Sequence, residues 1–189
     1  YKNDLKTGIW RYYYSNKKLE QKGKYSKGKL TGKWVWNYKN GQIHREEYYK
    51  KGKEEGEFIE YDEKGEILTR GDYVNGEKDG NWFYKVGDHK EIGYYSDGLK
   101  DGEWIHYYDN GNKRFIGKYK NGKPIEKHQY FFQNGKKKWV GIYSLGKKEG
   151  KWVRYNEMGE TIVTYNFRND KLIKTDGKKI KPAFKDEID

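Results

Sequence analysis

The sequence contains no cysteine, 2 prolines and one methionine among its 189 residues. Without cysteine the chain forms no disulfide and offers no thiol nucleophile or thiolate metal ligand, and its redox compartment stays open. No apolar run approaches the roughly 20 residues that a membrane-spanning helix requires. Hydrophobic residues make up 33% of the chain, which is too little for an aliphatic core of ordinary size.

Aromatic residues supply the apolar surface that aliphatic residues do not. The chain has 20 Tyr, 7 Trp and 7 Phe, together 18% of its residues. Each buried aromatic side chain removes about 150–250 Å² from water, so these rings can hold a fold together. We therefore expect a folded domain and not a disordered chain, despite 37% charged residues and a mean hydropathy of -1.36.

The glycines mark an internal repeat. Four glycine columns share one spacing, mostly 24 residues, and they hold all of the 24 glycines except Gly177. A period between 20 and 50 residues predicts a repeat architecture. The column that precedes the tryptophan of each copy consists of Gly8, Gly32, Gly56, Gly80, Gly102 and Gly150.

The aromatic residues keep the same register. The tryptophan column is Trp10, Trp34, Phe58, Trp82, Trp104, His128 and Trp152, and the tyrosine column is Tyr25, Tyr49, Tyr73, Tyr95, Tyr119, Tyr143 and Phe167. Aromatic and β-branched segments bounded by Asn-Gly, Asp-Gly or Lys-Gly predict β-hairpins. The predicted fold class is all-β: an elongated repeat array of antiparallel β-hairpins in an open meander sheet, with about seven copies of 24 residues.

Alternation along the first strand of each copy separates two faces. One face is expected to be packed. It carries Val35, Ile59, Phe83, Ile105 and Val153 together with a further column of the same strand, Tyr13, Asn37, Tyr61, Lys85, Tyr107, Phe131 and Tyr155. The other is expected to carry the tryptophan column and, two residues later, a half-exposed column of rings and charges. If Asn-Gly forms the two central turn residues, the tryptophan column lies opposite a glycine column, whose bare backbone leaves room for a ring.

The recurring pattern G-x-W-x-x-Y…N-G…G-x-Y-x-x-G-x-x-x-G is seen as GKWVWNYKNGQIHREEYYKKGKEEG and GEWIHYYDNGNKRFIGKYKNGK. It resembles the MORN repeat in its bacterial variant, MORN_2, found in YwqK-type proteins described as antitoxins. The resemblance covers residues 1–173 and implies an open sheet of hairpins without a catalytic centre, which serves as a scaffold for proteins and sometimes binds acidic phospholipids. Residues 174–189 are expected to be either a cap on the last sheet edge or a basic tail.

Some copies depart from the pattern. Glu126 and His128 replace the glycine and the tryptophan of the sixth copy, and Glu47 replaces another glycine. The fourth copy lacks two residues between Trp82 and Gly87. We expect these copies to be distorted, and a local irregularity in a repeat array is a place to expect a partner.

No constellation of catalytic residues is present, so we expect a protein that is not an enzyme and that uses no cofactor or metal ion. His44, His89, His106 and His128 fall in different columns, without the i, i+2 or i, i+4 spacing of a metal pair. The last of them is expected to pack in place of a tryptophan. Serines and acidic residues recur at equivalent turn positions, which is typical of turn residues and not of a unique nucleophile or acid–base pair.

The net charge of +12 and the pI near 9.4 favour anionic partners. The cations are interleaved with 29 acidic residues, however, as on ordinary solvated faces, and nucleic acid is not the expected partner. Two clusters stand apart as candidate anion-binding residues: Lys136, Lys137 and Lys138, and then Lys178, Lys179 and Lys181.

Two binding functions remain. The first is a scaffold for protein–protein interaction, with the antitoxin or immunity partner of a toxin as its most specific form. Its candidate partner-binding residues are the half-exposed column: Tyr12, Trp36, Tyr84, His106, Tyr130 and Arg154. The alternative is a secreted or surface protein that binds anionic lipid, glycan or a host protein. A first residue other than Met favours export over the cytoplasm, and dimerisation through open sheet edges stays an alternative.

Overall fold

The computed structural model describes residues 4–176 and 178–179. Tyr1–Gly102 and Glu103–Asp189 form two compact units, and the boundary between them falls within strand β9. The described residues contain strands, turns and loops and no helix, so no helical segment among them could cross a membrane.

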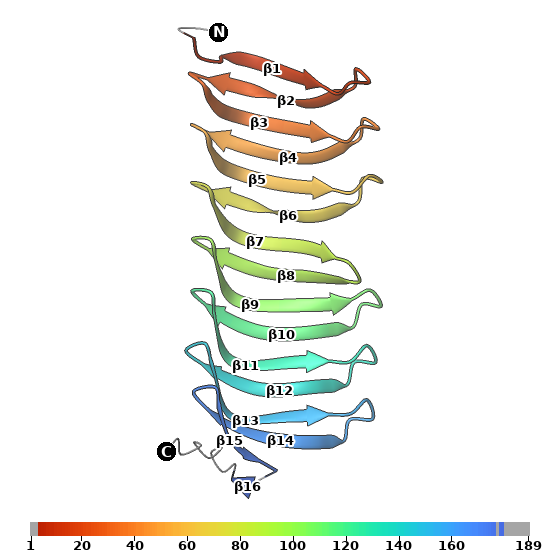
Figure 1. Ribbon diagram of the computed structural model, residues 1–189, viewed down its shortest axis with the longest axis vertical. Coiled ribbons are helices and arrows are strands. Elements are labelled where there is room, and N and C mark those ends of the chain that lie inside the picture. Colours follow the sequence, from red (N-terminus) through yellow and green to blue (C-terminus); the bar gives the residue numbers. More distant parts are fainter. Residues whose placement is uncertain (1–3, 177, 180–189) are drawn as a thin grey trace, which may run out of the picture. The chain divides into compact units, whose positions relative to one another are not determined.

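The first unit is a meander of antiparallel strands in sequence order (Figure 1). Each strand pairs with the next through a hairpin or a tight turn. The strands are β1 (Gly8–Tyr13), β2 (Leu19–Ser26), β3 (Lys29–Asn37), β4 (Ile43–Lys50), β5 (Lys53–Tyr61), β6 (Ile67–Val74), β7 (Glu77–Val86), β8 (His89–Ser96) and the beginning of β9 (Leu99–Tyr108).

The second unit repeats this arrangement (Figure 1). After the end of β9 it contains β10 (Lys113–Lys120), β11 (Lys123–Phe131), β12 (Lys137–Ser144), β13 (Lys147–Tyr155), β14 (Thr161–Arg168), β15 (Lys171–Thr175) and β16 (Lys178–Lys179). Neighbouring strands from β10 onward are again antiparallel. The predicted all-β, open meander of hairpins is therefore confirmed in each unit.

Two kinds of turn alternate along each meander. At one end, two-residue turns such as Lys27-Gly28 place both residues in the left-handed region, with φ of 49° and 76°, which is the geometry of a tight hairpin. At the other end, the loops are longer than the predicted two-residue Asn-Gly turns: the amide of Tyr38 donates to the carbonyl of Gln42, 2.8 Å away. A bulge after Trp36 restores the predicted register farther along the strands.

The fourth copy is regular, contrary to expectation. Its two missing residues shorten the long loop to a two-residue turn between Val86 and His89, and β7 and β8 pair without a register shift. The deletion therefore removes the bulge together with the loop, which leaves the hairpin undistorted.

The sixth copy is not distorted either. Glu126 has a φ of 58°, in the same left-handed region as the glycines that precede the other tryptophans. His128 is buried, and its Nε2 donates to the carbonyl of Lys118 at 2.9 Å. In a neighbouring copy the Trp152 indole donates in the same way to the carbonyl of Ile142. As expected, the histidine packs where other copies have a tryptophan.

The tryptophan column lies on glycines of the preceding copy. Trp34 lies so close to Gly23 that a Cβ there would be 2.0 Å from the indole. The register shift between β2 and β3 leaves residues 32–34 without regular partners opposite this glycine. Gly32 adopts a φ of 65° at the start of that bulge, and the indole then donates to the carbonyl of Lys24 at 3.2 Å.

The expected choice of the packed face is wrong: it is not the face that carries Val35 and Val153. Tyrosine-column rings pack edge-on against the tryptophan column, as Tyr25 does against Trp34 with ring centroids 5.0 Å apart. Residues opposite each other on paired strands share a face, so the tyrosine column lies with the tryptophans and not with the valines. This aromatic face is the packed one: Trp34, Trp82, Trp104 and His128 are its fully buried side chains.

Candidate binding site

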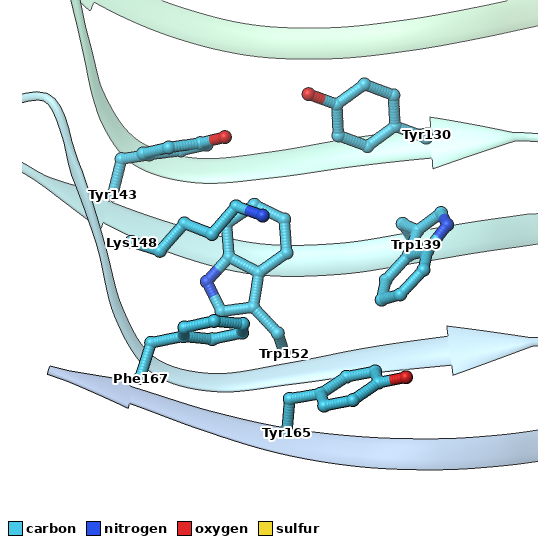
Figure 2. Close-up of a pocket in the computed structure, with 7 residues that line it drawn as sticks. All are labelled: Tyr130, Trp139, Tyr143, Lys148, Trp152, Tyr165 and Phe167. Atoms are coloured by element: carbon cyan, nitrogen blue, oxygen red, sulfur yellow. The ribbon is translucent and has the colours of Figure 1, made fainter. Parts of the chain in front are cut away.

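A groove opens on the aromatic face of the second unit, with a cavity volume of about 360 Å³. It crosses β11 to β14, and rings form most of its wall (Figure 2). The lining residues are Tyr130, Trp139, Tyr143, Lys148, Trp152, Tyr165 and Phe167.

The floor of the groove is built as in the other copies. Trp152 lies over Gly141, where a Cβ would be 2.0 Å from the indole. Tyr143 and Phe167 pack edge-on against Trp152 from the two neighbouring strands, with ring centroids 5.0 and 6.2 Å away. Edge-to-face contacts of this kind fix the orientation of each ring. The floor is therefore preformed.

Trp139 forms the other end of the groove. It lies opposite both Tyr130 on β11 and Arg154 on β13, and its ring stacks on Tyr165 with centroids 5.8 Å apart. The guanidinium of Arg154 lies 5.7 Å from the centre of the same ring, within the range of a cation–π contact. Trp139 thus adds a large ring to the wall of the groove.

Lys148 brings a positive charge into the groove. Figure 2 shows its side chain extending across Trp152, on the same side as Tyr143 and Phe167. The ammonium lies 4.9 Å from the Trp152 ring and 5.2 Å from the Phe167 ring. None of the lining residues carries a carboxylate.

The hydroxyls of Tyr130 and Tyr143 stay neutral at ordinary pH. Burial raises the pKa of Tyr130 and of Tyr143, because a low-dielectric environment disfavours the phenolate. The groove therefore offers hydrogen-bonding hydroxyls, ring faces and an ammonium group. Such a site can stack on a ligand and hydrogen-bond to it.

The predicted partner-binding column is divided between the two units. In the first unit, Tyr12 packs on Trp10, Trp36 on Trp34 and Tyr84 on Trp82. In the second unit, His106 packs on Phe115, with ring centroids 4.8 Å apart, while Tyr130 lines the groove and Arg154 lies at its end. Of the six predicted residues, Tyr130 therefore lines the groove and Arg154 lies beside it, next to Trp139.

Two of the predicted anion-binding lysines, Lys136 and Lys138, contact neighbouring residues. Lys136 donates to the carbonyl of Met158 at 2.9 Å, and the ammonium of Lys138 lies 5.5 Å from the Phe132 ring. Lys137 is exposed at the start of β12. Lys178 and Lys179 form β16, and Lys181 lies outside the described residues.

Sequence reasoning missed Lys148, Trp139, Trp152 and Tyr165 as groove residues. Trp139 could have been identified from the sequence, because it is a tryptophan outside the tryptophan column. The equivalent positions of earlier copies hold Gln21, Arg45, Thr69, Glu91 and Phe115. A large ring at a position that is polar in most copies indicates a local function.

No match was found among curated proteins. Among solved structures, the chain is similar to a crystal structure of an S. aureus TarM mutant in complex with Fondaparinux, alpha-GlcNAc-glycerol and UDP, at 13% sequence identity and a TM-score of 0.32. That similarity covers 59% of this chain and 19% of the other.

The family described as the MORN repeat variant matches four segments: residues 6–27, 30–51, 54–75 and 100–121. Each segment begins shortly before a tryptophan-column residue and ends in the tight turn after the second strand of its hairpin. MORN repeats are generally associated with binding of proteins or membrane lipids. Four segments of the chain are therefore similar to MORN repeats of this variant, and each of them corresponds to one hairpin of the sheet.

Proposed function

We propose that this protein is a non-enzymatic binding module whose groove holds a segment of another protein. The observation that carries the proposal is the row of partly exposed rings over β11 to β14, with the Lys148 ammonium among them. Tyrosine and tryptophan are the residues that dominate binding energy at protein interfaces. Their rings are already held by neighbours, so little side-chain entropy is lost on binding.

The antitoxin or immunity role is the most specific form of this proposal. Its support is the resemblance of the repeats to those of YwqK-type proteins described as antitoxins. In this form the partner is a toxin that the chain neutralises by binding. Substitutions in the groove then reduce protection of cells that express the toxin.

The test compares three classes of ligand with one pair of variants. The immobilised protein is offered a random-peptide display library, a glycan array and phosphatidylserine vesicles. The groove variant is Trp139→Thr, which copies the chain's own Thr69 at the equivalent position. The control is Ile142→Ala. Ile142 is exposed and lies between Gly141 and Tyr143, which face the groove. Because side chains alternate along a strand, Ile142 is on the opposite face.

We expect the protein to enrich a set of related peptides, the groove variant to lose that enrichment and the control to keep it. Binding to glycans or vesicles, without any peptide, contradicts the proposal and favours the alternative function. Equal loss in both variants also contradicts it, because the bound surface then lies elsewhere.

A further inference from the structure

Two copies of the first unit show how a lysine is held on the aromatic face. The ammonium of Lys6 lies 4.7 Å from the Trp10 ring and donates to the Tyr12 hydroxyl at 2.8 Å. Lys78 repeats this arrangement at 4.3 Å from the Trp82 ring, and it donates to the Tyr84 hydroxyl at 2.8 Å. In both copies a tyrosine two residues after the tryptophan accepts the hydrogen bond from the lysine.

In the last copy, the position of the accepting tyrosine is occupied by a second cationic residue. Lys148 is the equivalent of Lys6 and Lys78, and its ammonium likewise lies over a tryptophan, Trp152. The position two residues later, however, is Arg154. A guanidinium only donates hydrogen bonds, so it cannot accept one from Lys148. One cation therefore lies over Trp152 and the other over Trp139, where the copies of Trp10 and Trp82 pair a cation with a hydroxyl.

Neither Lys148 nor Arg154 forms a side-chain salt bridge among the described residues. The carboxylate beside Lys148, that of Asp170, accepts a hydrogen bond from the Lys148 backbone amide at 2.7 Å. The first unit shows the contrast, because Arg45, which lies over the Trp36 ring, is paired with Glu47 at 3.0 Å. A pair of cations over an apolar floor attracts an anionic group, and loss of water strengthens that attraction.

The tight turn beside the groove carries an unusual residue. Leu145 has a φ of 50° and is 83% exposed. The left-handed conformation is costly for a residue with a bulky side chain, and the equivalent turn positions of other copies hold Lys27, Lys51, Asn75, Asp97 and Asn121. The turn joins Tyr143 and Lys148, both of which line the groove. Leu145 thus places an exposed apolar side chain at the rim of the groove.

We infer that the groove binds an acidic peptide segment. A carboxylate of the segment lies between Lys148 and Arg154, and an apolar side chain beside it packs on Trp152 and Trp139. Leu145 contacts a further apolar residue of the same segment. This inference rests on the proposed function and names the chemistry of the partner. The exposed leucine favours a peptide over an acidic glycan or a lipid headgroup, because neither of those offers an apolar side chain to this rim.

The inference is tested with one pool of ten-residue peptides in which Asp, Glu, Asn, Gln, Lys, Leu, Phe and Gly are equally frequent. Immobilised protein captures peptides from the pool at low salt, and mass spectrometry reads the composition of the captured fraction. We expect about tenfold enrichment of peptides that carry Asp or Glu next to Leu or Phe over their amide counterparts, as for the loss of one charge-assisted hydrogen bond.

The variants take their new residues from equivalent positions in other copies of the repeat. Arg154→Tyr restores the residue of the Tyr12 and Tyr84 copies, and Lys148→Leu copies Leu30 at the equivalent position. Either change is expected to abolish the preference for acidic peptides while thermal unfolding stays close to that of the native chain. Lys151→Leu removes the same charge from the opposite face of β13 and is expected to keep the preference.

Capture of amide and acidic peptides in equal amounts overturns the inference but leaves the proposed function intact. Loss of the preference in the Lys151→Leu variant overturns it as well, because net charge then accounts for the selection. If the pool is not captured at all, while heparin or phosphatidylserine vesicles are, both the inference and the proposed function fail.

Discussion

The indole of Trp82 lies directly on the backbone of Gly71, in the strand before it, where a Cβ would be 2.2 Å from the ring. The indole nitrogen donates to the carbonyl of Asp72 at 3.2 Å. In the second copy Glu47 replaces this glycine, and the residue that it faces in the next copy is Phe58 in place of a tryptophan. A residue larger than glycine thus coincides there with a ring smaller than indole.

Gly71→Ala is expected to destabilise the protein by about 1–3 kcal/mol, because the methyl group forces the Trp82 ring out of its position. Adding Trp82→Phe should recover part of that loss, since the smaller ring leaves space for the methyl group. Urea unfolding of the two single variants and the double variant measures the coupling. Strictly additive effects would contradict the matching of ring and glycine.

His128 makes the stability of the second unit dependent on pH. Burial lowers the pKa of this imidazole in the folded state. Above a pH of about 6.5 the side chain is neutral in both states and contributes no pH dependence. As the pH falls below that value, the unfolded chain takes up a proton that the folded chain does not, so stability decreases, by at most about 1.4 kcal/mol per pH unit.

The matched variant is His128→Trp, which restores the column residue. It is expected to flatten the dependence of the unfolding free energy on pH between about 7 and 5.5, the range below the ordinary histidine pKa. Three other histidines remain in both chains and serve as the internal reference. An unchanged slope would mean that they, and not His128, account for the dependence.

The long loops are tied together by tyrosine hydroxyls. The Tyr38 hydroxyl donates to the carbonyl of Tyr61, in the next copy, at 2.7 Å, and Tyr108 does the same to Phe131 at 2.9 Å. Tyr38→Phe is expected to cost about 1 kcal/mol, since one hydrogen bond is lost and a carbonyl is left without it. Tyr13→Phe, at an exposed ring, is the control and should change the unfolding free energy little.

Glu126→Gly is expected to stabilise the sixth copy by about 1 kcal/mol. Glu126 occupies the left-handed region with a φ of 58°, which costs a residue with a Cβ about 1–2 kcal/mol, whereas glycine adopts it freely. Glu126→Ala retains the backbone strain and loses the same contact with Lys118. A glycine variant no more stable than the alanine variant, in thermal unfolding, would refute the role of backbone strain.

The hairpins could be predicted from the sequence because their determinants are local. Glycines such as Gly28 and Gly76 have φ of 76° and 90° in tight turns, and their spacing alone places the strands. The regular fourth copy was not predicted, because a shorter loop removes a bulge whose presence depends on loop geometry. The packed face was assigned wrongly, because alternation along a strand separates two faces without specifying which of them carries the tightly packed side chains.

The groove could be predicted only in part. Tyr130 and Arg154 belonged to a column chosen for its mixture of rings and charges. Trp139 and Lys148 were missed because their significance depends on contacts between copies: one stacks on Tyr165 of β14, and the other crosses Trp152. Such contacts need the bulged register between β12 and β13, which no periodicity in the sequence specifies.

The contact of each indole with the glycine before it gives the array a direction. The ring of Trp34 depends on Gly23 and on the carbonyl of Lys24 in the preceding copy, whereas nothing in this contact depends on the copy that follows. Trp10, on the first described strand, donates instead to Thr7 within its own copy and is only half-buried. Folding can thus be templated from one copy to the next, and a newly synthesised hairpin would find its docking surface already formed by the hairpin made before it.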